Sequence, residues 1–183
     1  RGTPNNPATT LPSFAIQPAA DATVQDPLIR RVGLWWEGPG PGPGLLEALA
    51  GLPMVKIVAL QTGPLRDHAL GRLTELGITD RGEAIADFRD LAAAIREVDV
   101  LIAPDGLVAH LGGSLEVETW VLVGRDGSWY WPGETQTSPW YPASRAFRQC
   151  PDGAWTVALE ALRTALTTAP DAPVDGPLTG DPA

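Results

Sequence analysis

The sequence is poor in the residues that hold metals, form disulfides or span membranes. Among 183 residues it has one cysteine, one methionine, two histidines and one lysine. The lone Cys150 forms no disulfide within the chain, and two histidines provide no cluster of metal ligands. The longest apolar runs, such as residues 55–60, are strand-sized and far short of the roughly 20 residues that cross a bilayer. The sequence therefore predicts a metal-free protein without a membrane span, and a cytoplasmic location is the default expectation.

Positive charge is also scarce. The formal net charge is -9, and the isoelectric point is near 4.6. Such a surface repels phosphate backbones, and the sequence shows no basic stripe with interleaved aromatic residues, so nucleic acid is excluded as a main partner. A ligand the size of a nucleotide is compatible with this charge, because helix N-termini and a few arginines bind phosphate locally.

Composition divides the chain into a body and two tails. Residues 1–29 and 169–183 are rich in proline and small residues and lack helix or strand periodicity, as is typical of extended tails or linkers. Residues 30–168 carry the periodic apolar pattern and form the predicted folded body.

Short apolar runs alternate with helical patterns along this body. Strands are expected at residues 31–36, 55–61, 99–103 and 119–123, with a short one near 78 or 84–85, and helices at 45–50, 65–76, 88–97, 107–115 and 154–166. This alternation predicts an α/β fold, a Rossmann-like, doubly wound and mostly parallel sheet.

A polar pair follows the predicted strand at 99–103. In an open parallel sheet, ligands bind at the carboxyl ends of the strands, where Asp105 stands just before a helix that contains His110. The two side chains could hold a phosphate and sugar hydroxyls beside the helix N-terminus. Alternatively, Asp105 caps the helix and His110 lies at the edge of the core.

Several segments carry a family resemblance. They are VALQTGP (58–64), ADFRDLAAAIREVDVLIAPDGLVAHLGGSLEVETWVLV (86–123), WYW (129–131) and SPWYPASRAFRQ (138–149). In this order they resemble the C-terminal lobe of heptosyltransferase-like GT-B glycosyltransferases, in particular the variety often fused to tetratricopeptide repeats in bacteria. The resemblance implies a single GT-B lobe that binds a nucleotide-sugar donor and needs no further cofactor.

The resemblance also implies which residues meet the donor. Asp105, Gly106, Leu107 and His110 take the places of donor contacts. Further contacts to phosphate or sugar are expected from Gly38, Gln61, Thr62 and Arg125. The family's catalytic base lies in a separate acceptor-binding lobe, so no catalytic residue is expected in this chain. Its expected partner is that missing N-terminal lobe or another protein.

Three departures weaken the enzymatic prediction. The loop EGPGPGPG (37–44) replaces a loop that is polar and basic in the family, Thr62 stands where lysine is common, and Gly106 stands where threonine is usual. A departing diphosphate needs positive charge or helix dipoles, and the cations left for this role are Arg125, Arg145 and Arg148. The alternative is therefore a catalytically degenerate lobe that acts as a scaffold or interaction subunit of a larger assembly.

Aromatic residues gather after the predicted strand at 119–123. We expect Trp140 and Tyr141 to pack against the sheet, since that is the role their counterparts in the family suggest. For Trp129 and Trp131, two interpretations stay open: a wall that stacks on a base or sugar, or packing of the loop.

Overall fold

The computed structural model describes residues 28–132 and 136–168, and within them it confirms the predicted α/β fold. Six strands form one sheet in the order β3-β2-β1-β4-β5-β6, and all five neighbouring pairs are parallel. The strands are β1 (Arg30–Leu34), β2 (Val55–Ala59), β3 (Thr79–Asp80), β4 (Val100–Pro104), β5 (Thr119–Val123) and β6 (Ser144–Arg148). This strand order is that of a doubly wound Rossmann-like sheet.

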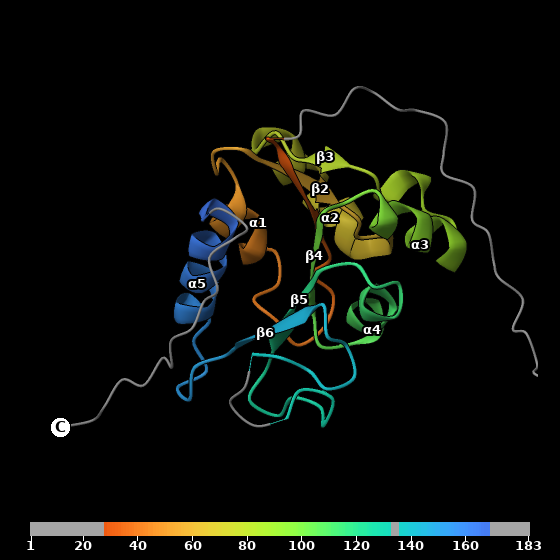
Figure 1. The fold of residues 1–183 in the computed structure, drawn as a ribbon. Helices are drawn as coiled ribbons and strands as arrows, with labels where there is room; N and C mark the ends of the chain where they lie inside the picture. The colour runs from red at the N-terminus through yellow and green to blue at the C-terminus, as the bar shows by residue number, and fades with distance from the viewer. Residues whose placement is uncertain (1–27, 133–135, 169–183) are drawn as a thin grey trace, which may run out of the picture.

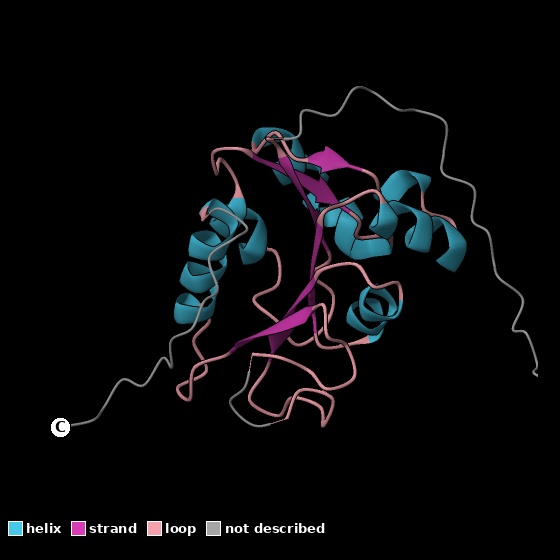
Figure 2. Ribbon diagram, viewed as in Figure 1, coloured by secondary structure: helices cyan, strands magenta, loops and turns pink. Residues whose placement is uncertain are grey.

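Helices cover both faces of the sheet. They are α1 (Gly44–Leu49), α2 (Gly63–Glu75), α3 (Phe88–Arg96), α4 (Leu107–Ser114) and α5 (Thr156–Thr167). Figures 1 and 2 show α1 and α5 on one side of the sheet and α3 and α4 on the other. Helix α2 packs on the same face as α1 and α5. Its buried Ala69 and Leu73 belong to the same core cluster as residues of those two helices.

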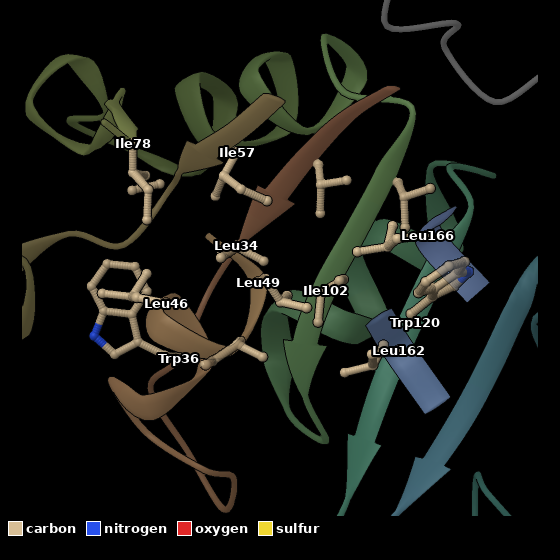
Figure 3. Packing of buried hydrophobic residues seen from close by; sticks show 14 of the residues in the cluster. Leu34, Trp36, Leu46, Leu49, Ile57, Ile78, Ile102, Trp120, Leu162 and Leu166 are labelled. Atoms are coloured by element: carbon tan, nitrogen blue, oxygen red, sulfur yellow. The ribbon is translucent and has the colours of Figure 1, made fainter. Parts of the chain in front are cut away.

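The sheet therefore separates two apolar cores. The larger core joins alternate residues of the strands to α1, α2 and α5, and Figure 3 shows Leu34, Ile102 and Trp120 among its side chains. The other core lies under α3 and α4 and includes Leu101, Val121 and the buried Trp131. Because strands buried on both faces need apolar residues at every position, β4 and β5 consist of near-continuous apolar runs.

One strand was missed by the sequence analysis. Strand β6 lies at the edge of the sheet and pairs with β5, within a segment that the pattern indicated to be loop. Its sequence SRAFR hides the strand because two of its five residues are arginines. The guanidinium of Arg145 lies over the ring of the buried Trp120, 5.4 Å from its centroid, and this contact accommodates an arginine on the side of the core.

The two predicted tails fall almost wholly outside the described residues, 28 and 29 excepted. The predicted short third strand is present as β3 at Thr79–Asp80, whereas Gly82–Ala84 form a turn of 3₁₀ helix. The helix expected at residues 45–50 is present as α1, which begins one residue earlier, at Gly44, after the proline-rich loop.

Helix α3 begins with a complete capping box. The carboxylate of Asp87 accepts hydrogen bonds from the backbone N–H groups of Arg89 and Asp90, and the carboxylate of Asp90 accepts from the backbone N–H of Asp87. These two backbone donors lower the pKa of Asp87 from its ordinary value of 3.8. Asp87 is therefore a negatively charged cap at neutral pH.

We expect this cap to make the fold sensitive to acid. A carboxylate with a lowered pKa in the folded state stabilises the fold above its unfolded pKa, and that contribution is lost as the pH falls through the folded pKa. The Asp87→Asn variant keeps a capping side chain at every pH. Its melting temperature should consequently fall less than that of the wild type between about pH 5 and pH 2. Identical pH profiles for the two proteins would contradict a titrating cap.

Candidate functional site

A cleft opens at the carboxyl ends of β1 and β4. The chain leaves β1 toward β2 on one side and reaches β4 on the other, so this is the point where the strand order reverses and where Rossmann-like sheets bind ligands. The cleft has a volume of about 630 Å³, within the usual range for small-molecule sites. Its lining residues are Trp35, Glu37, Thr62, Ile85, Ala86, Asp87, Phe88, Leu91, Pro104, Gly106, Leu107 and Val108.

Two walls flank the cleft. We call residues Ile85, Ala86, Asp87, Phe88 and Leu91 the α3 wall, and residues Pro104, Gly106, Leu107 and Val108 the α4 wall. In Figure 1, α3 and α4 lie next to each other on the same side of the sheet. The floor between the walls comes from residues that follow β1 and β2.

The α4 wall presents free backbone donors. Gly106 is the N-cap of α4, and no side chain forms a cap hydrogen bond there. Within the described residues, the backbone N–H groups of Leu107 and Val108 have no hydrogen-bond acceptor. An uncapped helix N-terminus carries partial positive charge and favours an anion.

Helices α2 and α3 also begin at the cleft. No side chain caps α2, and its N-cap Thr62 lines the cleft with a hydroxyl that forms no hydrogen bond to any described residue. The start of α3 is different, because the carboxylate of Asp87 already occupies its backbone N–H groups. Only the α2 and α4 ends are therefore open to a ligand.

The cleft is otherwise apolar or acidic. Among the described residues that line it, the charged side chains are Glu37 and Asp87, and none is lysine, arginine or histidine. Glu37 accepts a hydrogen bond from the side-chain amide of Gln61 at 3.1 Å. Attraction for an anion thus comes from backbone groups rather than from basic side chains.

The structure gives Asp105 a role that neither interpretation of the sequence foresaw. Its carboxylate accepts hydrogen bonds from the backbone N–H and hydroxyl of Ser128, at 2.7 and 3.0 Å, and from the indole N–H of Trp131, at 2.9 Å. It does not cap α4, so the capping interpretation is wrong. Asp105 instead connects the loop after β5 to the end of β4 through these hydrogen bonds. Asp105 itself does not line the cleft.

His110 lies in an aromatic cluster rather than in the cleft. Its ring centroid is 4.6 Å from that of Tyr130, 5.6 Å from Tyr141 and 6.3 Å from Trp131. The imidazole Nδ1 is buried and has no hydrogen-bond partner in the described part of the chain. This environment is that of a histidine at the edge of the core.

Of the other predicted donor contacts, some line the cleft and others do not. Gly106, Leu107 and Thr62 line the cleft, whereas Gly38, Gln61 and Arg125 do not. Gln61 is fully buried, and its side-chain oxygen accepts hydrogen bonds from the backbone N–H groups of Trp36 and Glu37. Gly38 adopts a positive φ of 128° and lies close to Pro104, where a Cβ atom would come within 3.3 Å of that ring.

The three arginines expected near a departing phosphate do not line the cleft. Arg125 is exposed after β5, and its backbone N–H donates to Gln149. The guanidinium of Arg145 lies over Trp120, and that of Arg148 donates to the backbone carbonyl of Trp131. Their predicted role at a departing diphosphate has no support in these positions.

Aromatic residues of the loop after β5 separate into buried and exposed ones. Trp131 is buried, and Tyr141 is half-buried against the core, which confirms packing for these two rings. Trp140 is 56% exposed, so its predicted packing is wrong. Trp129 is 64% exposed, with its ring stacked on Tyr130 at a centroid distance of 3.9 Å.

Sequence reasoning missed the α3 wall and Trp35. Phe88 gave no signal, because its spacing to Leu91, Ala92 and Ile95, at i, i+3, i+4 and i+7, continues the core-facing stripe of α3. Only the structure shows that this first residue of the helix is exposed. Trp35 gave no signal either, since it continues the apolar run of β1.

Two kinds of feature are absent from the described residues. No cluster of three or more histidine, cysteine, aspartate or glutamate side chains with metal-binding geometry occurs in residues 28–132 and 136–168. No helix in the same ranges has the length and apolar character to cross a membrane.

The fold and the switch-point cleft define a Rossmann-like α/β domain. No protein-family model matches the chain, and no solved structure matches it. The chain is similar to Protein FlbA of Caulobacter vibrioides: an alignment over 153 residues with 30% identity covers 70% of this chain and 25% of FlbA. The chain thus spans about a quarter of the length of this relative.

Proposed function

We propose that this domain binds a nucleotide sugar in the switch-point cleft and acts as the donor-binding lobe of a GT-B-type glycosyltransferase. The observation that carries the proposal is the uncapped N-terminus of α4 in a cleft of nucleotide size. The backbone N–H groups of Leu107 and Val108 would donate to the phosphate, and the hydroxyl of Thr62 to a phosphate or sugar oxygen.

The domain would need a second lobe to transfer the sugar. Among the described residues, no lysine, arginine or histidine lines the cleft, so the lining offers no side-chain cation for the leaving phosphate. The acceptor-binding lobe, or another protein that takes its place, would have to supply that cation and, as the family resemblance implies, the catalytic base. FlbA is about four times as long as the part matched here, which leaves room for such a region in that protein.

A scaffold role is the second candidate. The carboxylate of Asp105 accepts hydrogen bonds from the loop after β5. The cleft lining contains two carboxylates and no basic side chain among the described residues. These features favour a lobe that has lost donor binding and keeps the fold as a platform for a protein partner. The two candidates differ in whether any nucleotide sugar binds.

The decisive experiment removes one backbone donor and keeps the helix. Proline is tolerated at the first helical position, and the extended backbone of Gly106 (φ 168°, ψ -169°) suits the residue before it. We expect Leu107→Pro to weaken binding of a nucleotide sugar about 10-fold, because a hydrogen bond to the charged phosphate is lost. Calorimetric titration of the 183-residue chain with UDP, ADP, GDP and CMP sugars measures this change.

Leu107→Ala is the matched control, since it removes the same exposed side chain and keeps the N–H group. It should bind the nucleotide sugar more tightly than the proline variant. Equal affinities for the two variants would contradict phosphate binding at α4. If none of the four nucleotide-sugar types binds to the wild-type chain, the donor-lobe proposal fails and the scaffold candidate stands.

A further inference from the structure

Phe88 is exposed at a point where hydrogen bonds hold the backbone that carries its ring. It is the first residue of α3 and 62% exposed, whereas Leu91, Ala92, Ala94 and Ile95 of the same helix are buried. The capping box formed by Asp87 and Asp90 fixes the backbone on either side of this ring. A phenyl ring has only two side-chain torsions, so an exposed one that lines a cleft loses little side-chain entropy when a flat ligand stacks on it.

The surroundings of Phe88 are apolar on the α3 wall. Ile85, Ala86 and Leu91 lie on the same wall, and Trp35 lines the cleft from the end of β1. Such a surface suits a flat and weakly hydrated group. The opposite wall offers backbone donors instead, at Leu107 and Val108.

Charge orients a ligand between the two walls. Asp87 is ionised on the α3 wall and repels a phosphate, while the N-terminus of α4 attracts one. A molecule with an aromatic ring at one end and a phosphate at the other would therefore bind with its ring against α3 and its phosphate against α4. Nucleotides have this distribution of polarity.

Resting on the proposed function, we infer that the nucleobase of the donor stacks on the ring of Phe88. Phe88 is in this case the residue of this lobe that holds the base, and the cap at Asp87 holds the backbone from which its ring projects. Stacking is tolerant of base identity, because each base has a π-face. Selection among bases would then fall to other groups of the cleft.

The test compares variants of Phe88 in the full chain. Calorimetry is run with UDP, ADP, GDP and CMP, and with the matching nucleosides, which have the base and no phosphate. We expect Phe88→Ala to weaken the tightest nucleotide and its nucleoside by the same factor, about 10-fold. Phe88→Trp should keep most of the affinity, and Phe88→Leu, which is apolar but cannot stack, should behave like the alanine variant.

Val157→Ala is the control for loss of an exposed apolar side chain. Val157 is 53% exposed in the first turn of α5, on the opposite face of the sheet, and does not line the cleft. This variant should bind nucleotide like the wild type. Since Phe88 and Val157 both lie outside the core, melting temperatures near that of the wild type are expected for all variants and verify that they are folded.

The outcomes separate the inference from the function on which it rests. If nucleotides bind and Phe88→Ala or Phe88→Leu binds them as tightly as the wild type, base stacking on Phe88 is wrong and the donor-lobe proposal survives. A drop for the nucleotide without a drop for the nucleoside also overturns stacking. If no nucleotide binds to the wild type, the proposed function itself fails, and the exposed ring is left as a contact for a partner protein.

Discussion

Asp105→Ala is expected to lower the free energy of unfolding by about 3 kcal/mol. The substitution leaves three donors without their acceptor: the backbone N–H and hydroxyl of Ser128 and the indole N–H of Trp131. Trp131 is only 3% exposed, so its indole N–H cannot turn to water without opening the loop. Hydrogen bonds to a charged acceptor contribute more than neutral ones, and a buried donor left unpaired carries the full desolvation penalty.

Urea unfolding monitored by tryptophan fluorescence measures this loss, and hydrogen exchange at the Ser128 amide locates it. Exchange at this amide should be faster in Asp105→Ala than in the wild type. Asp126→Ala is the matched control, because Asp126 is an exposed carboxylate of the same loop with no hydrogen bond or ion pair to any described residue. It should change neither quantity appreciably.

The same variant decides between the two roles of Asp105. A stabilising role predicts that Asp105→Ala still binds nucleotide at temperatures where it is folded. If Asp105→Ala is as stable as the wild type and has lost nucleotide binding, the carboxylate contacts the ligand, as the family resemblance predicts. The hydrogen bonds to Ser128 and Trp131 would then be replaced when the ligand binds.

The fold could be predicted because its signals are local. Alternation of strands and helices gave the parallel sheet, and the strand at residues 119–123 was predicted with its observed bounds. These features depend on periodicity and on side chains within a few residues of one another. Strand β6 escaped prediction because the contact that allows its arginine inside, with Trp120, comes from a distant segment.

The candidate site could be predicted only in part, for the same reason. The sequence located the edge of the sheet, and Gly106, Leu107 and Thr62 do line the cleft there. It could not tell that Asp105 has partners 23 and 26 residues later in the chain. The residues around Asp105 in the sequence would be the same whether its carboxylate binds a ligand or another loop of the protein. Tertiary contacts decide between the two roles.

Gln61 illustrates how such a contact controls the shape of the cleft. Its side-chain oxygen accepts the backbone N–H groups of Trp36 and Glu37, at 3.2 and 3.0 Å, and its amide nitrogen donates to the carboxylate of Glu37 and to the carbonyl of Thr62. This one buried side chain ties the segment after β1 to the segment after β2. Both segments contribute to the cleft lining.

Gln61→Met is accordingly expected to cost about 3 kcal/mol of folding free energy. Methionine has nearly the same length and fills the same space, so the loss reports hydrogen bonds rather than a cavity. The buried N–H of Trp36 and the N–H of Glu37 lose their acceptor, and Glu37 loses the donor that holds it at the floor of the cleft. Chemical denaturation measures the cost, and hydrogen exchange at the Trp36 amide should become faster.

Thr62→Val is the control for this variant, because the Thr62 hydroxyl forms no hydrogen bond to any described residue and its loss should leave stability nearly unchanged. Gln61→Glu adds a second comparison. It keeps an acceptor for the two backbone N–H groups but brings a second carboxylate beside Glu37, so its stability should rise as the pH is lowered and one carboxylate is protonated. A Gln61→Met protein as stable as the wild type would contradict this structural role, and the phosphate contact that the sequence predicts would then be the role left for Gln61.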